Sequence, residues 1–405
     1  MSSRDDLGLL TGPDATDLLG SALATAGGEL LDWSVRQVDH RPGSGTTVAY
    51  RVRVRWADRE QVETLAATTA ITHEPTPGVL TLADGDLQVS VWRFPVDPAL
   101  PGLGAACDRR VIARLLTSFG LPGVDADGTT VRLRTRAYRP GRRAVIEATC
   151  PGGRLFVKVV RPQWVEDLHR RHSVLYAAGL PVPRSLGWTE DGLLVLQALR
   201  GSSLRAQLRA GGAAPSGEEL VQMLGRLPDE VLELPHRRSW TDNVSHYAKV
   251  IGATLPVEAA RATQLAAQVR SAVAGIPPDE PTHGDLYEAQ LLVSGAAITG
   301  LLDVDTAGPG RRADDLACAI AHLHVLADID AQEPGVPAPY LTAVAGQWQE
   351  AAERAVDRVE LRNRVAGVLM SLATGPHRVQ EPGWEAATSR RLDLVEQWAE
   401  SATAR

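Results

Sequence analysis

The sequence predicts an α+β protein in which two β-rich blocks precede a helical block. Short alternating or apolar segments fill residues 30–96 and again 131–161, with Gly- and Pro-containing turns between them. After Gly201 the pattern becomes mostly helical, apart from one short strand pair near Leu291 and Leu301. A chain of 405 residues is longer than one hydrophobic core usually serves, so two or three domains are expected.

The first block is expected to form an extra N-terminal α+β domain over residues 1–125. It opens with a helix at residues 4–26. Residues 48–56 read V-A-Y-R-V-R-V-R-W, and this alternation of apolar and charged side chains is typical of a half-buried antiparallel strand. A linker rich in proline and glycine follows at residues 94–103.

The second block, residues 126–200, is expected to be β-rich with one helix, which Pro162 begins and Gly179 ends. Residues 201–405 are expected to form a helical domain. The tripeptide Arg-Pro-Gly precedes a strand in both β-rich blocks, at residues 41–43 and 139–141. The first block could therefore be a degenerate copy of the second.

Composition excludes several classes of partner. A net charge of −7 argues against nucleic acid or an anionic membrane. The three cysteines, Cys107, Cys150 and Cys318, lie far apart, which indicates neither a zinc site nor a disulfide framework and fits a reducing cytosol. No signal peptide or membrane-spanning segment is evident. We expect a soluble, cytoplasmic protein, and the sequence does not indicate its oligomeric state.

The segment with the clearest chemical pattern begins at His283-Gly284-Asp285. Gln290 follows five residues after the aspartate, and a predicted hairpin then leads to Asp303 and Asp305. Because a hairpin brings its two ends together, the acidic residues are expected to meet at one mouth. A metal–phosphate complex could bind there.

Phosphoryl transfer needs an aligned hydroxyl, a proton acceptor and cations that neutralise the phosphates. The order His-x-Asp, amide, hairpin, aspartate is the protein-kinase catalytic arrangement. Asp285 would accept the hydroxyl proton, while Gln290 and Asp303 offer the oxygen ligands that Mg²⁺ prefers. Asp305 is either a second metal ligand or a solvent-facing residue. His283 is expected to brace the loop.

Lys158 is the one charged residue in the apolar strand 155–160, where an ammonium group needs an anion. The α- and β-phosphates of ATP would be such an anion, and Glu166 is the candidate carboxylate that holds the lysine, with Asp167 as the fallback. Two alternatives remain: Lys158 extends to solvent from an edge strand, and Glu166 is a surface residue. The turn beside Arg142 lies where a kinase covers the phosphates, but it has a single glycine. Arg142 is a candidate for nucleotide binding.

These residues resemble the aminoglycoside phosphotransferase and choline-kinase-like superfamily, from about residue 131 to the C-terminus. The superfamily has His-Gly-Asp, four residues, then Asn. Gln290 departs from this pattern and is similar to the maltokinase-like sugar kinases, which carry an N-terminal cap domain. The resemblance implies a bilobal protein-kinase-like fold, with adenine against a segment that includes Gln197 and Leu199. It also implies that Asp315 is structural.

The acceptor site is less defined. Glu381, Trp384 and Glu385 form an acidic, aromatic turn that would suit a sugar or amino sugar, or else the tryptophan anchors a surface loop. His322 and His324 lie in an apolar helical segment and are expected to be packing or capping residues rather than metal ligands.

The sequence therefore predicts an enzyme, a small-molecule kinase that uses ATP and Mg²⁺ to phosphorylate a hydroxyl of a sugar or amino sugar. An aminoglycoside or other antibiotic is the alternative acceptor. A kinase-like pseudoenzyme that acts as a binding module is the alternative function.

Overall fold

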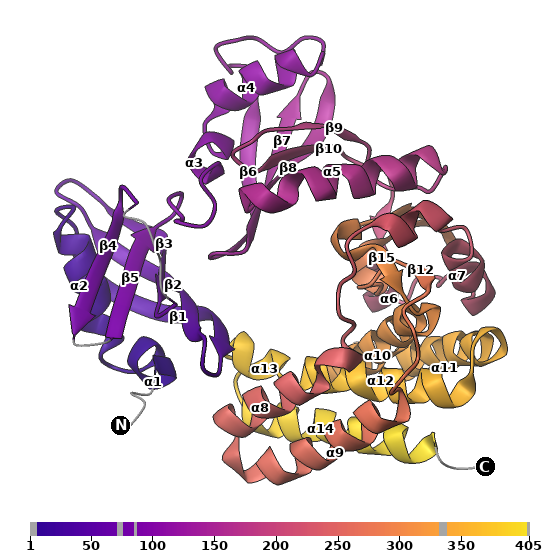
Figure 1. Cartoon of the computed structure of the whole chain (residues 1–405). Coiled ribbons are helices and arrows are strands. Elements are labelled where there is room, and N and C mark those ends of the chain that lie inside the picture. The colour runs from indigo at the N-terminus through magenta and orange to yellow at the C-terminus, as the bar shows by residue number, and fades with distance from the viewer. Residues whose placement is uncertain (1–5, 71–75, 85–86, 332–337, 403–405) are drawn as a thin grey trace. The chain divides into compact units, whose positions relative to one another are not determined.

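The computed structural model describes residues 6–70, 76–84, 87–331 and 338–402. The chain forms two compact units. The first contains residues 1–166, 186–197 and 377–382, and the second contains the rest. Figure 1 shows two sheets in the first unit and a mostly helical second unit. The three-domain boundaries expected from the sequence stay a prediction.

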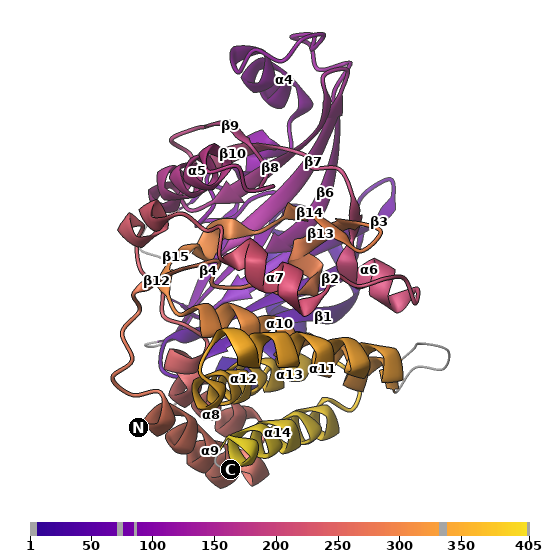
Figure 2. The ribbon, with the colours of Figure 1, turned by 90° about the vertical axis from the view of Figure 1, so that its right-hand side faces the viewer.

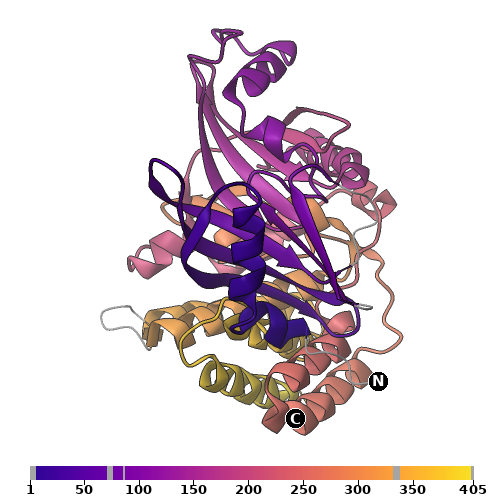
Figure 3. The same cartoon turned by 90° about the vertical axis from the view of Figure 1, so that its left-hand side faces the viewer.

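The N-terminal sheet is antiparallel, with strand order β1-β2-β3-β5-β4. Its strand β2 has Val52 and Val54 buried and Arg51 and Arg53 exposed, as the alternating sequence predicts. Figure 3 shows the first two helices, in indigo, across one face of this sheet. The elements are α1 (Asp6–Thr11), α2 (Ala15–Ala24), β1 (Glu29–Arg41), β2 (Gly45–Arg55), β3 (Glu60–Thr68), β4 (Val79–Asp84) and β5 (Leu87–Arg93).

The single helix expected at residues 4–26 is instead two helices, and residues 4 and 5 lie outside the described part. The break falls at Gly12-Pro13. Proline has no N–H to donate to the preceding turn, and its ring clashes with the carbonyl four residues earlier.

The second sheet has the strand order β6-β7-β8-β10-β9. Asp108 caps α4 by accepting bonds from the backbone N–H groups of Arg110 and Val111. As predicted, α5 begins at Pro162, and Gly179 has a positive φ of 77° just beyond its end. The elements are α3 (Leu103–Ala106), α4 (Arg109–Ser118), β6 (Arg132–Arg139), β7 (Arg143–Cys150), β8 (Gly153–Val160), α5 (Pro162–Ala177), β9 (Ser185–Trp188) and β10 (Leu193–Gln197).

The two sheets share one topology. In each, the first three strands follow chain order and the last two are exchanged. The two Arg-Pro-Gly tripeptides both connect the first strand to the second, and Gly43 and Gly141 have positive φ angles of 77° and 68°. This equivalence supports the hypothesis that the first block is a degenerate copy of the second.

The second unit is mainly helical, and Figure 2 shows α10, α11 and α12 alongside one another. The predicted hairpin is present as β13 and β14, whereas the short pair β12–β15 was not predicted, because its strands are rich in proline and glycine. The elements are β11 (Ser202–Ser203), α6 (Leu204–Arg209), α7 (Gly217–Leu224), η1 (Asp229–Glu233), η2 (Thr241–Asn243), α8 (Val244–Thr254), η3 (Pro256–Glu258), α9 (Ala259–Ala272), β12 (Glu280–Thr282), η4 (Glu288–Gln290), β13 (Leu291–Ser294), β14 (Ala297–Leu301), η5 (Val304–Thr306), β15 (Gly308–Gly310), α10 (Arg312–Ala331), α11 (Ala338–Ala355), α12 (Arg358–Ala373), α13 (Gly375–Arg378) and α14 (Trp384–Ser401). Among the described helices, none has the length and apolar character that a membrane span requires.

A buried charge cluster joins α10 to α12. Arg364 donates to both carboxylate oxygens of Asp314 at 2.8 Å and to Glu360 at 2.8 Å. Arg364 is 3% exposed and Asp314 is 7% exposed. Burial raises the pKa of Asp314, and the Arg364 guanidinium opposes that shift. The cluster is therefore fully satisfied as long as all three groups are present.

We expect Arg364→Met to lower the free energy of unfolding by about 3–5 kcal/mol, because it leaves the buried Asp314 carboxylate without its cation, whereas Glu360 keeps its ion pair with Arg311. Chemical denaturation followed by circular dichroism measures the change. Arg358→Met, on the same helix with a side chain 52% exposed, is the matched control and should change stability by less than about 0.5 kcal/mol. Equal effects of the two substitutions would contradict the prediction.

Candidate active site

The segment His283–Asp285 and the segment after the hairpin lie together. Strand β12 pairs with β15, which joins Thr282 to Gly308. The Thr306 hydroxyl donates to the carbonyl of His283 at 2.9 Å. On the other side, β13 pairs with β14, and the Leu302 N–H donates to the Gln290 carbonyl at 2.8 Å. Both ends of the hairpin are thus fixed against the loop that carries Asp285.

Gly284 is required by the shape of this loop. Its φ of +84° favours glycine, and a Cβ there would lie 2.7 Å from the carbonyl oxygen of Thr306. A larger residue between His283 and Asp285 would therefore push the two segments apart.

His283 braces the loop through both ring nitrogens. Nε2 lies 2.8 Å from the Leu302 carbonyl oxygen and must donate to it, so Nδ1 accepts the Asp285 N–H at 3.3 Å. The ring is 1% exposed, and burial lowers the pKa of His283. A neutral imidazole that makes two hydrogen bonds is suited to positioning Asp285.

Asp315, at the start of α10, holds the same loop from the opposite side. Its two carboxylate oxygens accept the N–H groups of His283 and Gly284, both at 2.7 Å. The side chain is fully buried, and burial raises its pKa to about 7 despite these two bonds. This geometry agrees with the structural role that the family resemblance implied.

The candidate metal ligands lie at the two ends of the hairpin. Gln290 is 7% exposed, and its Nε2 approaches Asp303 Oδ2 to 3.4 Å. Asp303 is in the left-handed region with φ 54°, an uncommon conformation for a residue with a side chain. Asp305 lies near a different group: burial lowers the pKa of Arg171, and the charge of Asp305 partly opposes that shift. The ligand roles of all three residues stay predictions.

Tyr287 lies close enough to Asp285 and Asp303 for their charges to affect its pKa. Burial raises its pKa to about 12, and the charges of Asp285 and Asp303 add to the shift. Its ring stacks on His322 with centroids 4.1 Å apart, and the guanidinium of Arg205 lies 5.6 Å from it. Arg205 also donates at 2.6 Å to the fully buried Glu288. Sequence reasoning missed this group, since nothing in the spacing links residue 205 to the segment 283–305.

Two residues of α10 also reach the loop that carries Asp285. Cys318 Sγ lies 3.9 Å from Asp285 Oδ1, and burial raises the pKa of the thiol. One ligand atom each from Asp285, Cys318 and His322 lies within 4.8 Å of the others. His324 instead packs edge-on against Trp398 at 5.5 Å, as expected of a packing residue. No metal site at a cysteine was predicted from the sequence, because the spacing of the cysteines was compared only with one another, and not with acids or histidines.

Lys158 lies in the first unit on β8, between β7 and β10, and is 6% exposed. The edge-strand alternative is therefore wrong, because β8 has a hydrogen-bonded neighbour on each side. Glu166 is exposed on α5. Its pairing with Lys158 stays a prediction.

The turn beside Arg142 is held by acids that sequence reasoning did not assign. The Gly141 N–H and the Tyr138 hydroxyl both donate to Asp97 at 2.8 Å, and Arg161 donates to the Gly141 carbonyl. Arg142 donates to the two oxygens of Asp39, on β1, at 2.7 and 3.3 Å. Its guanidinium thus already has a carboxylate partner, and nucleotide binding by Arg142 stays a prediction.

The remaining candidates lie at the ends of elements. Gln197 is the exposed last residue of β10, and Leu199 follows it by two residues. Trp384 and Glu385 open α14, and Glu381 precedes that helix. Their roles in adenine and acceptor binding stay predictions.

Comparison with known proteins gives one family and one similar fold. Residues 141–333 match the phosphotransferase enzyme family. A choline/ethanolamine kinase family protein from Mesorhizobium loti is similar in structure, with a TM-score of 0.50 and 16% identity over 72% of this chain and 95% of that chain. An aminoglycoside phosphotransferase from Streptomyces rimosus is 21% identical over 62% of this chain and 96% of that chain, with a TM-score of 0.41. No curated protein matches the chain.

The chain therefore carries a phosphotransferase-family segment, and the resemblance predicted from the sequence is confirmed. The α+β, protein-kinase-like fold is confirmed as well, and the N-terminal sheet fits an extra cap domain. The expectation of a phosphotransferase that acts on a hydroxyl group is supported by the family match over residues 141–333.

The raised pKa of Asp315 gives a pH-dependent prediction. Between its ordinary value of 3.8 and about 7, the folded protein keeps a proton that the unfolded chain has lost. Stability therefore falls as pH rises through this window, by on the order of a few kcal/mol. Asp315→Asn removes this titration, so its free energy of unfolding should vary less between pH 4 and pH 7. Denaturant unfolding at several pH values measures both slopes, and parallel slopes would contradict the assignment.

Proposed function

We propose that the protein is an ATP-dependent small-molecule kinase with Asp285 as its catalytic base. The observation that carries the proposal is the fixed loop of Asp285, which His283 and Asp315 brace from two sides. A loop held in this way suits a reaction that depends mainly on alignment and charge.

In the proposed reaction the carboxylate of Asp285 accepts the acceptor's hydroxyl proton while the hydroxyl oxygen attacks the γ-phosphorus. The bond to the bridging β–γ oxygen breaks, and ADP leaves. Lys158 holds the α- and β-phosphates. Gln290 Nε2 donates to Asp303 Oδ2 at 3.4 Å, so the two side chains are neighbours. The Gln290 amide oxygen and the Asp303 carboxylate would together be a donor set that fits Mg²⁺. Bound Mg²⁺ supplies neutralisation of the phosphate charge.

A sugar or amino sugar is the acceptor we propose first. Gln290 in place of asparagine and the N-terminal sheet support it, since both are similar to maltokinase-like enzymes. An aminoglycoside or another antibiotic that offers hydroxyl and amino groups is the alternative within the same class. In either case Glu381 and Glu385 would bind amino groups, and Trp384 would stack on a ring.

A catalytically inactive, kinase-like binding module is the second candidate. The contact of Arg142 with Asp39 and the exposure of Glu166 favour it, because both residues were candidates for nucleotide binding. Magnesium-dependent ATP binding without turnover on any acceptor would support this candidate.

We expect Asp285→Asn to lower turnover by about 10²- to 10⁴-fold, because the amide cannot accept the hydroxyl proton. ATP binding should remain, as measured by calorimetry. Asp229→Asn, at an exposed site in the same unit, is the matched control and should keep wild-type turnover. Turnover of Asp285→Asn within a factor of a few of wild type would refute the assignment of the base.

ATP consumption with Mg²⁺ across monosaccharides, amino sugars, maltose and aminoglycosides should identify the acceptor class. We expect a response to a sugar or amino sugar that Asp285→Asn abolishes. Turnover on aminoglycosides alone would select the alternative acceptor, whereas ATP binding with no turnover across the panel would favour the binding module.

A further inference from the structure

Three side chains of different chemistry meet beside the proposed base. Cys318 and His322 are four residues apart on α10 and therefore share one face of the helix. Asp285 faces them from the catalytic loop. One ligand atom from each of the three lies within 4.8 Å of the others, and Cys318 Sγ lies 3.9 Å from Asp285 Oδ1.

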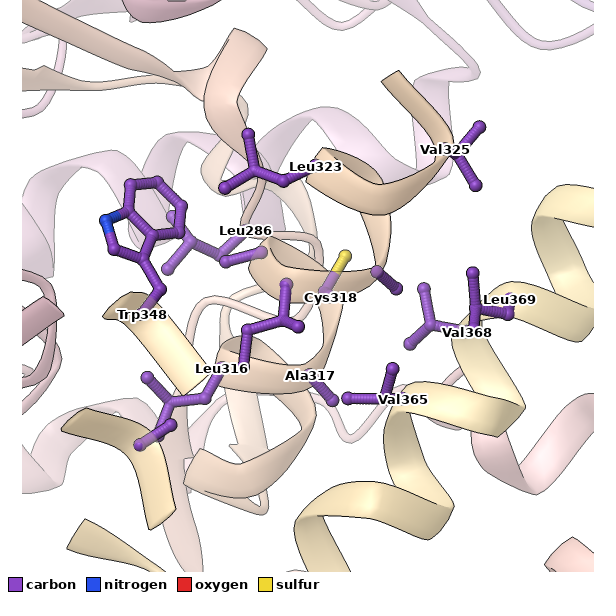
Figure 4. Packing of buried hydrophobic residues seen from close by; sticks show 14 of the residues in the cluster. Leu286, Leu316, Ala317, Cys318, Leu323, Val325, Trp348, Val365, Val368 and Leu369 are labelled. Atoms are coloured by element: carbon purple, nitrogen blue, oxygen red, sulfur yellow. The ribbon is translucent and has the colours of Figure 1, made fainter. Parts of the chain in front are cut away.

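Each of the three is held in place by a different contact. The backbone N–H of Asp285 is bonded to His283, and the ring of His322 stacks on Tyr287 at 4.1 Å. Cys318 is 1% exposed and belongs to the hydrophobic core of the second unit, where Figure 4 shows it near Leu316 and Ala317. The thiol thus forms the buried end of the group, while Asp285 and His322 are half-buried.

We propose that Asp285, Cys318 and His322 form a binding site for a soft divalent cation, Zn²⁺ above all. A thiolate, an imidazole and a carboxylate are zinc ligands, and three protein ligands leave a fourth position for water. Mg²⁺ prefers oxygen donors alone, so the same set selects against the cation of the kinase reaction.

Only a small movement of the three side chains is needed to bring their ligand atoms to zinc-binding distances. Tetrahedral zinc, with bonds of about 2.0–2.3 Å, separates its ligand atoms by about 3.5 Å. The present separations of 3.9 Å and up to 4.8 Å exceed this by about 0.4 Å and up to about 1.3 Å, which side-chain rotation can supply. On binding, the Cys318 thiol loses its proton to solvent and the metal–sulfur bond replaces the S–H bond.

The effect of such a cation on turnover rests on the proposed function. A cation bound to the Asp285 carboxylate occupies the oxygen that would accept the hydroxyl proton. Zinc at this site would therefore inhibit the kinase reaction by occupying its base, through a ligand set different from the oxygen ligands Gln290 and Asp303.

Titration of the full-length, metal-free protein with Co²⁺ tests the site without any assay of turnover. We expect one equivalent to bind with a thiolate-to-cobalt charge-transfer absorption, and Zn²⁺ to displace it. Cys318→Ser and His322→Gln should each weaken binding by at least about 100-fold. Cys318→Ala is a second variant, and circular dichroism establishes that each variant is folded.

The matched controls are Cys150→Ser and His324→Gln, a buried cysteine in the first unit and a histidine on α10 that packs on Trp398. Both should retain the absorption. No thiolate absorption, or an absorption that survives in folded Cys318→Ser, would overturn the proposal and leave the thiol as a packing residue that donates to Asp285.

Inhibition is tested separately, by ATP turnover at several free Zn²⁺ concentrations set by a metal buffer. We expect inhibition in wild type and in the two control variants, and a shift of at least about 100-fold to higher zinc in Cys318→Ser, each protein compared with its own zinc-free rate. Cobalt binding in a protein without turnover would support the metal site while rejecting the proposed function. Turnover that zinc inhibits equally in Cys318→Ser would overturn inhibition through this site.

Discussion

The contact between the Asp315 carboxylate and two consecutive backbone N–H groups determines the geometry of the whole candidate site. Two bonds of 2.7 Å fix the peptide planes on either side of His283 and turn the chain at Gly284. His283, fixed in turn by the Leu302 carbonyl, accepts the N–H of Asp285. A side chain from α10 thereby determines the orientation of a residue on a different segment. Without this carboxylate the loop would have buried N–H groups that no other described side chain satisfies.

In the first unit, too, the carboxylate of a single residue, Asp97, holds a turn in place. Asp97 accepts bonds from Tyr138 and Gly141, and the indole of Trp92 donates to the Tyr138 hydroxyl at 2.8 Å. The turn between β6 and β7 is thus held by residues that follow the N-terminal sheet. Arg142 adds an ion pair to Asp39 of that sheet. This turn contains one glycine, and hydrogen bonds from Gly141 to Asp97 and from Arg142 to Asp39 fix its position.

Features encoded by neighbouring residues could be predicted from the sequence, whereas contacts between distant residues could not. Alternation identified β2, Pro162 identified the start of α5, and the spacing of His283, Asp285 and Gln290 indicated phosphoryl transfer, because each signal lies within a few residues. The pairs Asp97–Gly141 and Arg205–Glu288 join residues 44 and 83 positions apart, and no periodicity encodes such partners. The helix predicted over residues 4–26 failed for a local reason, since Pro13 interrupts the hydrogen bonding. Cys318 was missed because its partners are an acid and a histidine.

The register of α10 links the brace of the loop to the proposed metal site. Asp315, Cys318 and His322 follow one another at intervals of three and four residues, so all three lie on one face of the helix. Asp315 holds the backbone before Asp285, while Cys318 and His322 flank its carboxylate. A rotation of α10 would displace all three together, and Arg364 opposes such a rotation by its bonds to Asp314 on the neighbouring position. The orientation of this single helix therefore determines both how the loop of the proposed base is held and how close Cys318 and His322 lie to it.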